Sequence, residues 1–294
     1  MSTPARPPIT AGVPRADRRR QQEQYRRRRV GVAAGALVVI MGGAALALAL
    51  SGGGAAPSAA PKPRLKPPIT TTTTLPDLTV TVATTRVLHL KVSTQPSATA
   101  PRLVVLGTAT NYGLPTTLLT DSSTSQDAPG WIRVIVPFRK PNETIGWVRE
   151  TDVTLSTTPY AINISLSQHT LVLLNAGQPV LSTSVIIGAP TSATPTGRFY
   201  LTDPVNCNEP LVPGYPVGRC SGAYGAFAIG TSGLSEVLDS FGGTIPQIAI
   251  HGTSLPDSEL GKDLSNGCVR MPNDVILAIA KITPLLGTPV TITA

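Results

Sequence analysis

Short runs of alternating apolar and polar residues dominate the second half of the chain. From Pro159 onward, this alternation predicts strands over residues 161–166, 170–174, 180–187, 197–202, 226–229, 247–251 and 289–293. Two stretches favour helices instead: Ser235 is placed to cap a short helix ending at Ser240, and Asn273 a longer one ending at Ile282. Many short strands and few helices predict a mostly β fold with a packed sheet.

Similar short β-rich runs, separated by turn residues, fill residues 78–156. They predict strands over residues 79–84, 87–92, 103–108, 131–136 and 145–148. We therefore expect a small β module here, ahead of a larger β domain at 159–294.

Residues 51–77 differ from both regions, because they contain six prolines, three glycines and an unbroken threonine run. Such a segment buries too little apolar surface to offset the entropy lost on ordering, so it is predicted to be a disordered linker. If extended, its 27 residues reach at most ~84 Å at about 3.1 Å per residue.

An uncharged, apolar stretch of 21 residues, 30–50, precedes the linker. As a helix it would be ~31 Å long, which matches the ~30 Å hydrocarbon core of a bilayer. Arginines on its N-terminal side predict a cytoplasmic tail (1–29), a single transmembrane signal anchor (30–50) and extracytoplasmic domains facing the cell wall. The alternative is a cleaved signal peptide, for which Ala47 and Ala49 are suitably small; both alternatives export the domains.

The net charge of +8 is concentrated in the same N-terminal region. Residues 1–29 carry nine arginines against Asp17 and Glu23, a net +7. The other 265 residues carry 15 basic and 14 acidic side chains, so no basic face is expected to bind nucleic acid.

Three cysteines, Cys207, Cys220 and Cys268, form an odd set, which in an exported protein suggests one bridge and one free thiol. Cys207 and Cys220 bracket a segment rich in proline and glycine, and a disulfide closing it would contribute on the order of 3 kcal/mol. Two unpaired thiols are the alternative, which an oxidising compartment disfavours. Neither CxxC nor HxxxH spacing occurs, so neither a metal nor another cofactor is expected.

Cys268 and His251 offer a nucleophile and a base near the C-terminus. A thiol is a weak nucleophile until it loses its proton, and an imidazole within hydrogen-bond reach can take that proton. Gly252 follows the histidine and Gly267 precedes the cysteine, so both side chains leave tight turns. Spacing alone leaves open that the two residues are unrelated and that Cys268 is a small buried residue.

The residues around this pair resemble the L,D-transpeptidases (YkuD type) of bacterial cell walls. The strongest matches are His251-Gly252-Thr253 and Ser265-Asn266-Gly267-Cys268-Val269-Arg270-Met271. Further matches, in the same order along the last 135 or so residues, are Tyr160-Ala161-Ile162-Asn163, Leu166-Ser167, Gly188-Ala189-Pro190, Thr194-Pro195-Thr196-Gly197, Gly222-Ala223-Tyr224-Gly225 and Gly287-Thr288-Pro289-Val290. The chain departs at Asn266, where the family most often has histidine; this bears on rate and pH profile, because asparagine carries no charge.

The resemblance implies a two-sheet β sandwich over 159–294 and a cysteine-dependent acyltransferase. Cys268 would be the nucleophile and His251 the proton donor and acceptor, oriented by the carbonyl of Gly252. Backbone N–H groups of Gly267 and Cys268 would stabilise the oxyanion. The implied substrates are peptidoglycan stem peptides, joined by 3→3 cross-links with release of D-alanine, and carbapenem β-lactams would be covalent inhibitors.

Five residues around the pair are candidates for substrate binding: Arg270, Asn266, Ser265, Thr253 and Tyr224. Arg270 lies two residues after the nucleophile, so in an extended segment it faces the same side, where it could orient a carboxylate. A structural ion pair is the equally good alternative for this residue.

Trp131-Ile132-Arg133-Val134 and Gly146-Trp147-Val148 loosely resemble two late strands of the small Src-homology-like barrels of wall-associated proteins. The module at 78–156 is therefore expected to be a small β barrel that either binds wall material or acts as a folded spacer. For the whole chain, two alternatives remain: an L,D-carboxypeptidase with the same dyad, and a non-catalytic wall-binding protein.

Overall fold

The computed structural model describes residues 79–122, 128–282 and 284–294. All of these residues belong to one compact unit. No helix within the described ranges is long and apolar enough to cross a membrane. The predicted tail, transmembrane anchor and linker, at residues 1–29, 30–50 and 51–77, lie outside those ranges.

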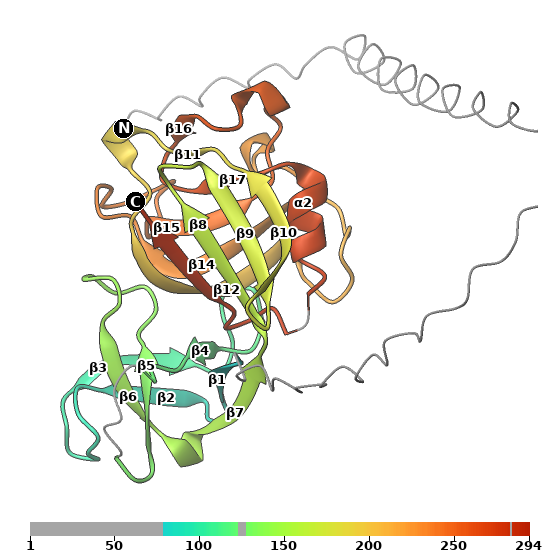
Figure 1. Ribbon diagram of the computed structural model, residues 1–294. Helices are drawn as coiled ribbons and strands as arrows, with labels where there is room; N and C mark the ends of the chain where they lie inside the picture. The colour runs from blue at the N-terminus through green and yellow to red at the C-terminus, as the bar shows by residue number, and fades with distance from the viewer. Residues whose placement is uncertain (1–78, 123–127, 283) are drawn as a thin grey trace, which may run out of the picture. The chain divides into compact units, whose positions relative to one another are not determined.

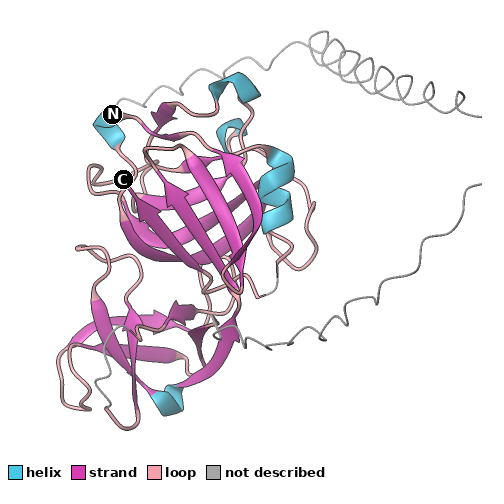
Figure 2. Cartoon of the chain, viewed as in Figure 1, coloured by secondary structure: helices cyan, strands magenta, loops and turns pink. Residues whose placement is uncertain are grey.

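The described part is mostly β, as the sequence predicts (Figure 2). Residues 79–158 form two small sheets, with strand orders β4-β1-β7 and β3-β2-β6-β5. Their strands are β1 (Val80–Thr85), β2 (His89–Ser93), β3 (Arg102–Gly107), β4 (Thr117–Leu119), β5 (Trp131–Ile135), β6 (Ile145–Arg149) and β7 (Val153–Thr158). Apolar side chains that alternate along these strands fill a core between the sheets, with Leu90, Leu118 and Val148 fully buried.

The larger sheet of the C-terminal part runs in the order β10-β9-β8-β18-β12-β14-β15-β17, with β13 paired to β12. Its strands are β8 (Tyr160–Ser165), β9 (Thr170–Asn175), β10 (Gln178–Ser184), β12 (Gly197–Cys207), β13 (Val217–Gly218), β14 (Phe227–Leu234), β15 (Gln247–His251), β17 (Val269–Arg270) and β18 (Pro289–Thr293). A separate parallel pair is formed by β11 (Ile187–Gly188) and β16 (Asp263–Ser265).

The two layers expected for this part are halves of one continuous sheet. The 11-residue strand β12 pairs with β18 through its first residues and with β14 beyond Leu201, where the register shifts. Such a bulge bends a strand and increases its twist. In Figure 1, β8, β9 and β10 accordingly lie in front of β12 and β14. The core between the halves contains fully buried side chains such as Leu171, Phe227 and Ile250.

Helix is scarce, and one of the two predicted helices is wrong. α2 (Asn273–Ile279) packs Ile276 and Ile279 inward against β14 and β15, but it is shorter than expected. Residues 235–240 form bends instead: the Ser235 hydroxyl accepts hydrogen bonds from the N–H groups of Val237 and Leu238, as in a cap, yet no helix follows. Four single-turn 3-10 helices complete the secondary structure: η1 (Glu150–Asp152), η2 (Pro190–Ser192), η3 (Gly222–Tyr224) and η4 (Asp257–Glu259).

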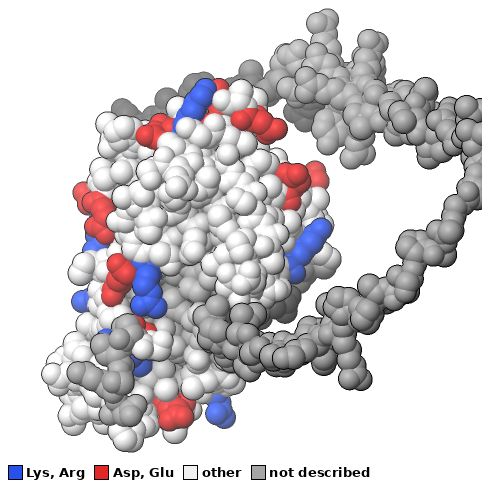
Figure 3. All heavy atoms as spheres, in the orientation of Figure 1, with Lys and Arg blue, Asp and Glu red and all other residues white. Residues whose placement is uncertain are grey.

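Basic and acidic side chains are intermixed on the face shown in Figure 3. On this face no basic surface stands out, which agrees with the near-neutral charge of the chain after residue 29.

Tyr200 on β12 joins the core of the N-terminal module. Its side chain is fully buried among that module's apolar residues, and its hydroxyl donates to the Ile135 carbonyl at 3.3 Å. Nearby, the Asn142 amide donates to the Leu234 carbonyl at 2.8 Å and accepts from the Leu234 N–H at 2.9 Å. The two cores are therefore tied together by buried contacts, not only by the chain.

Replacing Tyr200 by alanine is expected to destabilise the whole described unit by about 3–5 kcal/mol, because it leaves a cavity where the two cores meet. Tyr200→Phe removes only the hydroxyl and should cost about 0.5–1.5 kcal/mol. Urea unfolding followed by tryptophan fluorescence, which reports on Trp131 and Trp147, measures both values. An unchanged fluorescence transition in Tyr200→Ala would show that the N-terminal core does not depend on this contact.

Candidate active site

Cys268 and His251 lie at the ends of two adjacent parallel strands, β17 and β15. His251 ends β15, and Cys268 immediately precedes β17. The register pairs Ile250 with Val269 and His251 with Arg270. Because side chains alternate along a strand, His251, Arg270 and Cys268 share one face. The structure thus brings together the three residues that the sequence singled out for the chemistry.

His251 is held as a neutral base. The residue is 2% exposed, and Nδ1 lies 2.6 Å from the Gly252 carbonyl oxygen. A carbonyl only accepts a hydrogen bond, so this contact places the proton on Nδ1 and leaves Nε2 unprotonated. Burial lowers the pKa of His251 to about 4, helped by the positive charge of Arg270 and opposed by the carbonyls of Gly252 and Tyr224. The imidazole is therefore uncharged near neutral pH.

Cys268 is a free, partly buried cysteine. Burial raises the pKa of its thiol, while a backbone hydrogen bond with Ala249 and the charge of Arg270 lower it. Together with the low pKa of His251, this favours a neutral thiol beside a neutral imidazole instead of a preformed ion pair. No hydrogen bond links the Cys268 sulfur to the His251 ring in the described structure; catalytic hydrogen bonds commonly tighten only when substrate binds.

The turn before Cys268 requires glycine. Gly267 has a φ of 104°, and a Cβ on it would come within 3.1 Å of Ile248 Cδ1. Its N–H donates to Ser265 Oγ at 3.1 Å, so the expected oxyanion donor at Gly267 is already engaged. The Cys268 N–H donates no hydrogen bond within the described ranges and is the donor left for an oxyanion.

Ser265 shapes this turn, and its expected substrate contact does not fit its placement. The side chain is 1% exposed, and its hydroxyl donates to the Cys268 carbonyl at 2.5 Å. Its own carbonyl accepts from the Ala189 N–H and the Ser192 hydroxyl, both at 2.9 Å. Ser265 therefore locks the backbone on either side of the nucleophile.

The other expected substrate-binding residues differ in placement. Thr253 is 6% exposed, its hydroxyl accepts from the Leu255 N–H at 3.0 Å, and its carbonyl accepts from Asn273 Nδ2, so little of it is open to a substrate. Asn266 is exposed at the tip of the turn. The Tyr224 ring lies against His251, with ring centroids 4.6 Å apart, and burial raises the pKa of its phenol. Asn266 and Tyr224 therefore remain candidates for substrate contact.

Arg270 has no carboxylate partner in the described part of the chain. None of the ion pairs found there includes it, and its Nε is buried without a hydrogen-bond partner. This argues against the structural ion pair that the sequence left open. A guanidinium beside His251 and Cys268 is available to an anionic group of a substrate.

Cys207 and Cys220 form the expected disulfide, with an S–S distance of 2.09 Å. The loop that it closes is also ordered by Asn206, which sequence analysis missed. The fully buried Asn206 amide donates to the carbonyls of Val212 and Tyr215 at 2.8 and 3.0 Å and accepts from the Val212 N–H at 2.8 Å. Tyr215 in turn packs edge-on against Phe227 at the start of β14.

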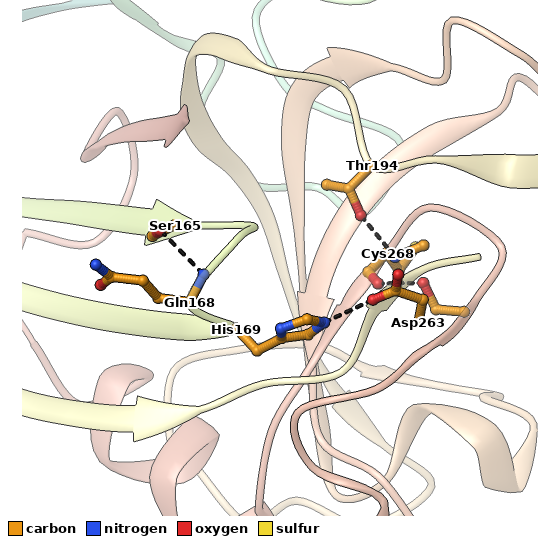
Figure 4. A network of polar contacts seen from close by, with 8 residues as sticks. Ser165, Gln168, His169, Thr194, Asp263 and Cys268 are labelled. Atoms are coloured by element: carbon orange, nitrogen blue, oxygen red, sulfur yellow. Dashed lines mark hydrogen bonds and ion pairs between the residues drawn. The ribbon is translucent and has the colours of Figure 1, made fainter. Parts of the chain in front are cut away.

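A second polar connection lies beside the Cys268 turn (Figure 4). His169, with a φ of 49° in the β8–β9 turn, is 2.6 Å from the Asp263 carboxylate on β16. His169 thus lies in the turn that joins β8 to β9. On the other side, the Thr194 hydroxyl accepts from the Gly188 N–H at 2.9 Å. The two contacts fix β16, which precedes the nucleophile in the chain, and the segment 188–194.

A family model of the L,D-transpeptidase catalytic domain, YkuD, matches residues 159–292. The chain is 35% identical over 136 residues to the YkuD protein of Bacillus subtilis (strain 168), covering 46% of this chain and 67% of that protein. Its match to the YkuD protein of Bacillus licheniformis is also 35% identical, over 137 residues, with 47% and 67% covered.

Among solved structures, Bd1075 of Bdellovibrio bacteriovorus is 26% identical with a TM-score of 0.34, covering 46% of this chain and 47% of that chain. The match thus spans about half of the Bd1075 chain. The chain belongs to the YkuD family, and its residues 159–292 are the L,D-transpeptidase catalytic domain of a cysteine-dependent acyltransferase.

Proposed function

We propose that the chain is a peptidoglycan L,D-transpeptidase that joins stem peptides by 3→3 cross-links. The observation that carries this proposal is the shared face of β15 and the Cys268 turn. There Cys268 and His251 lie together with Arg270, which has no ion-pair partner among the described residues. It offers a nucleophile, a neutral base and a cation for an anionic substrate, on a domain of this family.

In the proposed first half-reaction, Cys268 Sγ attacks the carbonyl carbon of the third stem residue. The thiol proton passes to His251 Nε2 as the C–S bond forms, and the Cys268 N–H stabilises the oxyanion. The amide C–N bond then breaks, and the proton returns from Nε2 to the leaving amine of D-alanine. The product is a thioester that conserves the acyl group for transfer.

In the second half-reaction, the side-chain amine of another stem attacks the thioester carbonyl. His251 takes a proton from this amine, the C–S bond breaks, and the Cys268 sulfur regains its proton. One peptide bond is exchanged for another, so the reaction needs no nucleotide to drive it. This balance suits the compartment outside the membrane, where we propose that the domain works.

We further propose that residues 30–50 anchor the chain in the cell membrane, with residues 1–29 in the cytoplasm and residues 51–77 as a tether. In this arrangement, the module at 78–156 is a small wall-associated barrel of the Src-homology type that reaches the polymer together with the catalytic domain. The arginine-rich start and the apolar run support this topology. The sequence supports an uncleaved anchor, because its apolar run exceeds the usual core of about 7–15 residues in a signal peptide.

Product analysis separates this function from a carboxypeptidase that uses the same dyad. The purified protein is incubated with a tetrapeptide stem ending in a diamino acid and D-alanine, with and without an added amine acceptor, and the products are weighed. We expect free D-alanine and a dimer. A tripeptide with no dimer at any acceptor concentration would make the chain a hydrolase, and failure to release D-alanine would contradict both activities.

A further inference from the structure

The side chain of Asn273 connects two loops on either side of His251. Its Oδ1 accepts from the Ala226 N–H at 2.8 Å, and its Nδ2 donates to the Thr253 carbonyl at 3.0 Å. Ala226 follows Tyr224 and Gly225 on the way into β14, and Thr253 follows His251 and Gly252 after β15. One amide therefore joins the loop below the Tyr224 ring to the loop that leaves the histidine.

Asparagine near the start of a helix usually caps it with a side-chain hydrogen bond, but Asn273 bonds to the two loops instead. It is the first residue of α2, Pro272 occupies the N-cap position, and no side-chain cap bond forms. Asparagine stabilises a helix mainly by capping and is a weak helix former inside it. The side chain at this position therefore serves the loops and not the helix.

The Asn273 amide is packed so tightly against both loops that no side chain larger than that of glycine fits at Gly225 or Gly252. A Cβ on Gly225 or on Gly252 would collide with Asn273 Oδ1, so both loops approach as closely as glycine permits. The Gly252 N–H also donates to the Phe227 carbonyl at 3.0 Å. The peptide units around Gly252 are thus held from two sides.

Gly252 is the residue whose carbonyl oxygen accepts the hydrogen bond from His251 Nδ1–H, at 2.6 Å. A rotation of the Gly252–Thr253 segment would move that carbonyl away from the ring. We propose that Asn273 is a positioning residue for His251: by fixing Thr253 and Ala226, its amide keeps the Gly252 carbonyl on Nδ1 and leaves Nε2 as the base. This inference rests on the proposed function, in which Nε2 takes the thiol proton.

The test compares Asn273→Ala and Asn273→Asp with the wild type by the state of the His251 ring. The chain has three histidines, so selective ¹⁵N-histidine labelling gives three imidazoles, and His251 is assigned by its absence in His251→Gln. In the wild type, we expect the tautomer with the proton on Nδ1. In Asn273→Ala, we expect a mixture of both tautomers, and a kcat for acyl transfer that is lower by roughly 10- to 100-fold with a smaller change in KM.

Asn273→Asp separates the two hydrogen bonds. It keeps an acceptor for the Ala226 N–H, but it loses the donor to Thr253 and places a negative charge near the ring. We expect the His251 titration to move to higher pH in this variant, because a nearby carboxylate favours the imidazolium. If Asn273→Ala does not fold, this conservative variant alone carries the comparison.

Asn206→Ala is the matched control, since Asn206 is also a buried asparagine that braces a loop through backbone hydrogen bonds, but in the disulfide loop. It should lower the melting temperature and leave the His251 tautomer and titration as in the wild type. If the Asn273 variants behave like Asn206→Ala, losing stability with no change in the His251 ring, the residue is only structural. The ring signals do not depend on turnover, so failure of the proposed function would leave this result readable.

Discussion

Replacement of Cys268 by alanine is expected to abolish acylation and transfer, with a loss of about 10⁴-fold or more, because Cys268 is the one free thiol of the described residues. The fold should persist, since the side chain is small and only partly buried. Mass spectrometry after exposure to a carbapenem measures the acyl adduct directly. We expect one adduct per chain on the wild type and none on Cys268→Ala.

The other two cysteines provide the internal control for this experiment. Cys207 and Cys220 are joined in a disulfide, so the folded chain should present one titratable thiol under non-reducing conditions, and the variant none. An adduct that survives in Cys268→Ala would move the nucleophile elsewhere. A folded wild type that never forms the adduct or releases D-alanine would support the alternative of a non-catalytic wall-binding protein.

Replacement of His251 by glutamine is expected to lower the acylation rate by about 10²–10⁴-fold, the usual contribution of a general base. Iodoacetamide labelling of Cys268 near neutral pH should slow as well, because burial raises the pKa of the thiol and no base remains to take its proton. The rate of labelling should recover only at higher pH. His89→Gln, which changes an exposed histidine of the N-terminal module, is the control and should label like the wild type.

The low pKa of His251 also fixes the direction of two pH effects. Acylation should fall as pH drops through about 4, where the imidazole becomes protonated and cannot accept a proton. Folding stability should be complete above about 6.5, the ordinary pKa of histidine in the unfolded chain, and should fall between there and about 4. In that window the unfolded chain binds a proton that the folded chain does not. His251→Gln should lack this part of the pH dependence, and urea unfolding at several pH values measures it.

Alternation was a sufficient guide wherever a strand has one buried and one exposed face. The strand 289–293 has the predicted bounds, because its apolar residues Val290 and Ile292 face the core at alternate positions. The strand 247–251 also has the predicted bounds, although every residue after Gln247 is buried. β12 continues to Cys207, well beyond the predicted residue 202, since both of its faces are buried and the pattern of alternation is lost. The helix predicted after Ser235 was wrong because the hydroxyl bonds that cap a helix also close a simple bend.

The sequence motifs were enough to locate the site, but they did not predict the roles of the individual residues in it. Sequence offered Gly267 as an oxyanion donor and Ser265 as a substrate contact, yet the two bond to each other. The contribution of Asn273 depends on two loops that lie about 20 and 47 residues away in sequence, and no local pattern records such a meeting. A hint existed: glycines at both 225 and 252 signal that something approaches the backbone there.

The placement of Tyr200 has a practical consequence for anyone who wants a smaller enzyme. A fragment that begins at residue 159 would keep every group of the dyad, but it would turn a large aromatic ring, now covered by Ile135 and its neighbours, out to water. An exposed apolar surface of this kind promotes aggregation. A minimal catalytic fragment would therefore need a polar residue at position 200. Otherwise the preceding module must be kept to cover Tyr200.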